Sequence, residues 1–102
     1  MKECCRKYLG EQLGNDMEVI NVIYAEYVSS IDDKMAEADA AVAAGAWDTL
    51  DKVAHTIKGN ALTAGDQQMA DVAIALRGVA KQQDSGGVDR LIADMKALAT
   101  QL

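Results

Sequence analysis

The sequence predicts an all-α fold: an antiparallel up-down four-helix bundle with a short additional helix at the N-terminus. Half of the 102 residues are apolar, yet only 4% are aromatic and none is phenylalanine. A core built from Ala, Val, Ile, Leu and Met favours close-packed helices over a β-sandwich. Proline is absent, so helices are expected to end only at glycines or at capping residues.

A short first helix is expected over roughly residues 3–12, because glycines follow at its end. Asn15 and Glu18 then have the spacing of a capping box, which predicts that a second helix starts at Asp16. Apolar residues alternate at steps of three and four from there to Gly45, as expected of one long amphipathic helix.

Three more amphipathic segments complete the predicted bundle. The third opens at Ala46 and ends at Gly65, and Asp66 can cap the fourth. A polar turn at residues 84–87 precedes a fifth helix that starts at Val88. Short connections make sequence neighbours antiparallel, because no single helix can bury its apolar stripe alone.

Three apolar residues lie off the main stripe of the second helix: Val19, Val22 and Ile23. We expect the short first helix to cover them, with some of them available to a protein partner.

A single domain is expected over residues 1–102, with its bundle core at about residues 15–102. The formal net charge of −6 argues against nucleic acid and acidic membrane surfaces as partners, since both attract clustered Lys and Arg. No apolar stretch reaches the roughly 18 residues that span a bilayer, and no signal peptide is apparent. We therefore predict a cytoplasmic protein, and a monomer, because the bundle satisfies each apolar stripe.

His55, the only histidine, is the candidate reactive residue. At about 100° per residue it points roughly 140° away from the apolar stripe of the third helix, so it should face solvent. Lys58 flanks it, and Gly59 follows one turn later on the same face. Because glycine inside a helix costs about 0.5–1 kcal/mol relative to alanine, Gly59 indicates close approach by a partner or a phosphoryl group. Leu62 is either a docking contact or a partly buried core residue.

The run AHTIKGNALTAG, residues 54–65, resembles the signature of histidine-containing phosphotransfer (HPt) domains, with four residues at the family's offsets: His55, Lys58, Gly59 and Gly65. The resemblance extends over about residues 15–100. It implies that His55 accepts a phosphoryl group from the aspartyl phosphate of a receiver domain and passes it to another receiver. Lys58 would then supply positive charge near the phosphoryl oxygens, and Gly59 would leave room for the receiver.

The resemblance also implies the partners and the cofactor requirement. Response-regulator receiver domains and a hybrid sensor histidine kinase are the expected partners. The domain would carry the phosphoryl group without catalytic turnover of its own, so it is not expected to be an enzyme. No cofactor or metal is expected, since the Mg²⁺ of aspartate chemistry belongs to the receiver. Imidazole suits this role because its neutral form is a nucleophile near pH 7.

One position departs from the family pattern. Family members often place Gln or Glu on the fourth helix, where it hydrogen-bonds the imidazole, whereas a gapless alignment puts Arg77 there. Arginine has no acceptor for a ring N–H. The expected alternatives for orienting His55 are therefore Gln68, a backbone carbonyl or water, and contact with the phosphoryl group is a second role open to Arg77.

Two functional classes stay open at this stage. The first is the phosphocarrier, and the second is a phosphorylation-independent helical binding module that docks a receiver or a histidine kinase. A hydrolytic or metal enzyme is not supported, because a single histidine without a cluster of Cys or carboxylate residues on its face offers no set of ligands. We interpret Asp48 and Asp51, which lie on the histidine face, as solvating charges. Cys4 and Cys5 are adjacent, which suits neither a mutual disulfide nor a zinc site, so we interpret them as ordinary thiols.

Overall fold

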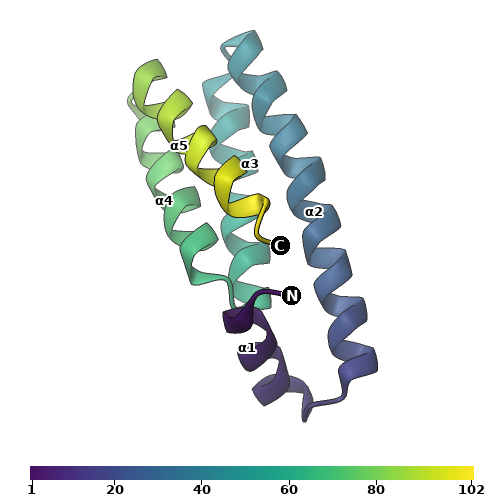
Figure 1. The fold of residues 1–102 in the computed structure, drawn as a ribbon. Coiled ribbons are helices and arrows are strands. Elements are labelled where there is room, and N and C mark those ends of the chain that lie inside the picture. The colour runs from purple at the N-terminus through teal and green to yellow at the C-terminus, as the bar shows by residue number, and fades with distance from the viewer.

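The computed structural model describes all 102 residues, which form five α-helices and no strand (Figure 1). The helices are α1 (Glu3–Leu13), α2 (Met17–Ala44), α3 (Trp47–Ala64), α4 (Gln67–Lys81) and α5 (Ser85–Ala99). Helices α2 to α5 run alternately up and down, and α1 lies against the lower part of α2 and the end of α3 (Figure 1). The predicted all-α fold, with four long helices and a short N-terminal one, is confirmed.

One cluster of 24 buried apolar residues draws on all five helices. Alanines make up half or more of the buried residues of α3 and α4: Ala54, Ala61 and Ala64 on α3, and Ala70, Ala73 and Ala80 on α4. Because the distance between two packed helices depends on the side chains at their contact, these small residues bring the two backbones close together. Side chains at the edges of α3 and α4 can therefore reach each other directly.

The structure corrects two helix starts. Asp16, not Asn15, caps α2, and its carboxylate accepts a hydrogen bond from the backbone N–H of Val19 at 3.4 Å. Asn15 has a φ of 62°, which is incompatible with the extended conformation typical of a capping residue. Helix α5 starts at Ser85 instead of Val88, because the Asp84 carboxylate caps it. Residues assigned to a polar turn thus form the first turn of that helix.

Helix α1 covers only part of the apolar surface at the start of α2 that it was expected to cover. Val19 and Val22 are 41% and 57% exposed, whereas Ile23 is half-buried and packs against the core. The core stripe of α2 begins at Ile20. Because Val19 and Val22 lie about 100° and 200° around the helix from Ile20, the single short helix α1 does not reach them.

Gly65 is the contact point between α1 and the turn that joins α3 to α4. It adopts a φ of 78° and caps the C-terminus of α3. A Cβ atom at this position would clash with the side chain of Tyr8 on α1. Only glycine meets both demands, so this residue lets α1 pack directly on the turn.

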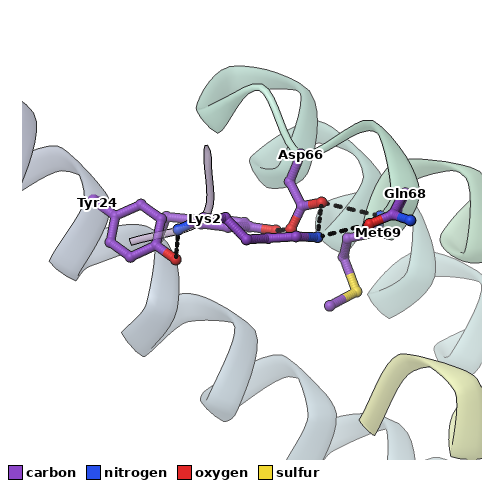
Figure 2. A network of polar contacts seen from close by, with 6 residues as sticks. Lys2, Tyr24, Asp66, Gln68 and Met69 are labelled. Atoms are coloured by element: carbon purple, nitrogen blue, oxygen red, sulfur yellow. Dashed lines mark hydrogen bonds and ion pairs between the residues drawn. The ribbon is translucent and has the colours of Figure 1, made fainter. Parts of the chain in front are cut away.

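Asp66, the one fully buried charged residue, ties three parts of the chain together (Figure 2). Its Oδ2 accepts a hydrogen bond from the Tyr27 hydroxyl at 2.7 Å. Its Oδ1 accepts from Lys2 Nζ at 2.9 Å and from the backbone N–H of Met69 at 3.3 Å, which caps α4. Burial of a carboxylate is costly unless hydrogen bonds replace its contacts with water, and these three donors do so. No buried side-chain nitrogen or oxygen in the protein lacks a hydrogen-bond partner.

No helix combines the length and the apolar character that crossing a membrane requires.

Candidate functional site

His55 lies on the exposed side of α3, near the middle of the helix. The opposite side of α3 carries a fully buried stripe: Leu50, Ala54, Ile57 and Ala61. Burial of that stripe fixes the rotation of the helix, and the 3.6-residue period then directs the histidine away from the core. Burial of the stripe on one side of α3 thus places the imidazole at the surface on the other side.

Arg77 of α4 reaches across to this ring. Its Nη1 lies 3.1 Å from His55 Nδ1, and its Nε donates a hydrogen bond to Asp51 Oδ1 at 2.9 Å. Asp51 and His55 are one turn apart on α3, so both can meet the same guanidinium group. The side chains of Arg77 and Asp51 are only 28% and 25% exposed, which limits the access of water to the pair. The hydrogen bond from Arg77 is the main cause that lowers the pKa of Asp51 below its usual value.

The contact with Arg77 determines the proton position on the ring. A guanidinium group carries five N–H donors and no acceptor. The nitrogen that faces it must therefore offer a lone pair, which means that Nδ1 is unprotonated. A neutral imidazole has one ring proton, so that proton lies on Nε2. The family pattern implies a ring N–H that needs an acceptor, whereas Nδ1 of His55 faces a hydrogen-bond donor.

Gln68 does not lie near His55. It is at the start of α4, where its Oε1 accepts a hydrogen bond from Lys2 Nζ at 3.2 Å (Figure 2). Nine residues separate it from Arg77, which corresponds to about 13 Å along the helix. The structure therefore does not bring Gln68 to the His55–Arg77 contact. Asp51, interpreted from sequence as a solvating charge, is instead part of the site, and its spacing of four residues from His55 was the available signal.

Lys58 flanks the histidine and is half-buried on α3. It takes part in none of the five ion pairs of the molecule. Its ammonium group is thus free to interact with an anion near His55. Asp48 is exposed, one turn before Asp51, and it too belongs to no ion pair.

The surface beside His55 is open and partly apolar. A Cβ atom added at Gly59 would have no atom within 4 Å, so no neighbouring helix of the bundle explains this glycine. Gly78, next to Arg77 on α4, is equally open. Leu62 is 43% exposed and Ile74 is 50% exposed. Because α3 and α4 are antiparallel, both apolar side chains lie on the same side of the His55–Arg77 contact. Sequence reasoning missed Ile74 and Gly78, although both interrupt the pattern of the fourth helix.

No group of three or more His, Cys, Asp or Glu side chains in the protein could hold a metal ion. Cys4 is exposed and Cys5 is buried, and both are free thiols. Burial and the neighbouring Cys4 raise the pKa of the Cys5 thiol to about 12.

A helical bundle with one exposed histidine, flanked by a lysine and an open glycine, is the arrangement that the resemblance to histidine phosphotransfer domains implies. A family model described as "Hpt domain" matches residues 22–102, which include α3, α4 and α5 and most of α2. The chain belongs to this Hpt domain family, as its sequence motif indicates. Domains of the family transfer phosphoryl groups in two-component systems and interact with receiver domains and kinases. Searches of curated proteins and of solved structures found no match to this chain.

Proposed function

We propose that this domain is a phosphocarrier in a two-component phosphorelay. His55 accepts a phosphoryl group from the aspartyl phosphate of one receiver domain and passes it to another receiver. The observation that carries the proposal is the exposed His55 beside an unpaired Lys58 and an open Gly59, in a chain of the Hpt family. The protein provides a nucleophile and a surface but no set of groups for turnover, so we propose that it is not an enzyme.

The proposed transfer exchanges one bond to phosphorus for another. His55 Nε2 forms a bond to phosphorus while the bond from phosphorus to the receiver's carboxylate oxygen breaks, and the carboxylate keeps the electron pair. Attack requires the ring proton on Nδ1, and this proton leaves to solvent once the bond from Nε2 to phosphorus has formed. Such transfer depends mostly on alignment and on stabilisation of charge on the phosphoryl oxygens. Lys58, three residues from His55 and in no ion pair, is the cation that we assign to that charge.

The surface around His55 suits a protein partner. Leu62 and Ile74 offer exposed apolar area on α3 and α4, and the gaps at Gly59 and Gly78 allow another backbone to approach the ring. We propose response-regulator receivers and a hybrid sensor histidine kinase as the partners, and neither nucleic acid nor membrane. We further propose a cytoplasmic monomer with no cofactor of its own, with Mg²⁺ supplied by the receiver.

A transfer assay tests the proposal. The protein is mixed with a receiver domain that carries labelled phosphate, and acid-labile, alkali-stable label on the protein is measured. We expect label on the wild type and none on His55→Ala. Absence of label on the wild type, or equal label on the two proteins, would overturn the carrier function. Circular dichroism of His55→Ala provides the control for folding, because the residue is exposed and its loss should leave the bundle intact.

The contact between Arg77 and Nδ1 favours a second candidate function. It leaves the proton of the neutral ring on Nε2, the nitrogen that has to attack phosphorus. A domain with an idle histidine could still dock a receiver or a histidine kinase through the surface around Leu62 and Ile74. In that case the receiver binds wild type and His55→Ala with equal affinity, and neither protein takes up label.

A further inference from the structure

Arg77 contacts the ring nitrogen that does not react. Its Nη1 faces Nδ1 of His55 at 3.1 Å, so Nε2 is the nitrogen left for a phosphoryl group. Before transfer, the neutral ring carries its proton on Nε2 and accepts a hydrogen bond at Nδ1. After transfer, phosphorus replaces that proton, and Nδ1 again carries a lone pair. The guanidinium group therefore suits the free ring and the phosphorylated ring alike.

During transfer itself, the ring needs its proton on the other nitrogen, Nδ1. Attack by Nε2 requires a lone pair on that nitrogen, which the neutral ring provides when its proton is on Nδ1. In the reverse direction, the bond from Nε2 to phosphorus breaks readily when Nδ1 carries a proton, because the ring then leaves as neutral imidazole instead of as an imidazolate anion. Both directions of transfer thus pass through a ring protonated on Nδ1.

Arg77 disfavours that protonated ring in two ways. Its N–H occupies the lone pair of Nδ1 at 3.1 Å, and the guanidinium group offers no acceptor to an N–H at that nitrogen. It cannot act as the acid itself, because a guanidinium group does not release its proton in proteins. An amide or carboxylate side chain at this position would accept a hydrogen bond from Nδ1–H and have the opposite effect.

Asp51 keeps Arg77 in this position. The ion pair of 2.9 Å fixes Nε of the guanidinium group, and its rigid plane then directs Nη1 at the ring. Lys81 on α4 also lowers the pKa of Asp51 through its charge, and Asp48, the other carboxylate on the histidine face of α3, belongs to no ion pair. No second carboxylate on these faces forms an ion pair with Arg77 in place of Asp51.

We infer that Asp51 and Arg77 form a kinetic brake on phosphoryl transfer through His55. They slow both the arrival and the departure of the phosphoryl group, and they give the phosphorylated domain a long lifetime. Arg77 is a positioning residue for the ring proton, and Asp51 acts through Arg77. This inference rests on the proposed carrier function and adds the rate at which that carrier works.

The first test reads the position of the ring proton without any phosphoryl donor. Two-bond ¹H–¹⁵N correlation spectra of the ¹⁵N-labelled protein at alkaline pH distinguish a proton on Nε2 from one on Nδ1. We expect the proton on Nε2 in the wild type and a shift toward Nδ1 in Arg77→Gln. Arg90→Gln is the matched control, because Arg90 is an exposed arginine of α5 without an ion pair. A merely structural role of Arg77 would not move this proton.

The second test measures the lifetime of the phosphorylated ring. Phosphoramidate, a small phosphoryl donor, is used to phosphorylate each protein, and loss of phosphohistidine after removal of the donor is followed by ³¹P NMR. We expect decay about tenfold faster in Arg77→Gln, since a neutral acceptor replaces a cation beside Nδ1. Asp51→Asn should lie between Arg77→Gln and the wild type. Arg77→Lys, which keeps a cation and offers no acceptor, should stay slow, and Arg90→Gln should equal the wild type.

The outcomes separate the brake from the carrier function. A wild-type ring proton on Nδ1, or equal lifetimes in wild type and Arg77→Gln, overturns the brake and leaves phosphorylation of His55 standing. If Arg77→Gln forms phosphohistidine and the wild type forms none, the brake is supported, because Arg77 then blocks phosphorylation completely. Absence of phosphohistidine from both proteins overturns the carrier function and the brake with it. Circular dichroism establishes that each variant is folded, as expected for changes to a pair about one quarter exposed.

Discussion

The hydroxyl group of Tyr27 is the only side-chain or backbone donor to Oδ2 of the buried Asp66, at 2.7 Å. Tyr27→Phe removes this one oxygen atom and leaves the ring in the core. A hydrogen bond to a charged group contributes about 1.5–3 kcal/mol. Because Oδ2 is then buried without a partner, we expect a loss of about 2–3 kcal/mol in the free energy of unfolding. For a domain of this size, a loss of about 2 kcal/mol lowers Tm by roughly 8–16 °C.

Urea unfolding followed by far-UV circular dichroism measures this loss directly. The midpoint should fall while the m-value stays constant, since the variant buries the same surface. Tyr8→Phe is the matched control, because Tyr8 is 37% exposed and its hydroxyl group forms no hydrogen bond within the protein. The control should stay within about 0.5 kcal/mol of the wild type. A Tyr27→Phe variant as stable as this control would refute the claim that Asp66 organises the junction of α2, α4 and the N-terminal segment.

Three further predictions concern the thiols and the face of α3. At pH 8, the exposed Cys4 should react readily with a thiol reagent. Cys5 should react about a thousandfold more slowly, because burial raises the pKa of its thiol to about 12. Fast reaction of both thiols would contradict this. Lys58→Ala should slow transfer from a phosphorylated receiver about tenfold, equivalent to about 1.4 kcal/mol of barrier, and an unchanged rate would remove Lys58 from the mechanism. Gly59→Ala should raise the free energy of unfolding by about 0.5–1 kcal/mol, because a Cβ atom meets open space there. The same variant should weaken receiver binding, measured by titration calorimetry; unchanged affinity would mean that no partner backbone approaches Gly59.

Stability should also depend on pH through the Cys5 thiol. Burial is the main cause that raises the pKa of this thiol above its ordinary value of about 8.5. The thiol form is therefore favoured in the folded state, and its contribution is fully present below about pH 8.5. As the pH rises from there toward 12, unfolded chains lose this proton first and the urea midpoint should fall. Cys5→Ala should flatten this part of the pH profile, and a profile identical to that of the wild type would contradict the assignment.

Local sequence patterns were sufficient to predict where the helices lie and which side of α3 faces solvent. Apolar residues at steps of three and four define both an element and its buried side, so the outward direction of His55 followed from Leu50, Ala54 and Ile57 alone. The predicted helix starts were wrong where the backbone conformation of a single residue determines which residue caps the helix. Asn15 has the side chain of a capping residue, but its φ of 62° excludes it from that role, and spacing in the sequence does not reveal φ.

The side-chain contacts at His55 and at Asp66 depend on how the helices pack against one another. Arg77 and Asp51 are 26 residues apart, and Lys2 and Asp66 are 64 residues apart, so no local pattern pairs them. The sequence by itself determined the helical class, the solvent-facing histidine and its lysine and glycine neighbours, because these follow from the period of one helix. Only the tertiary structure decided that Arg77 meets Nδ1 of the ring, because that contact joins two helices and depends on how α3 and α4 pack against each other.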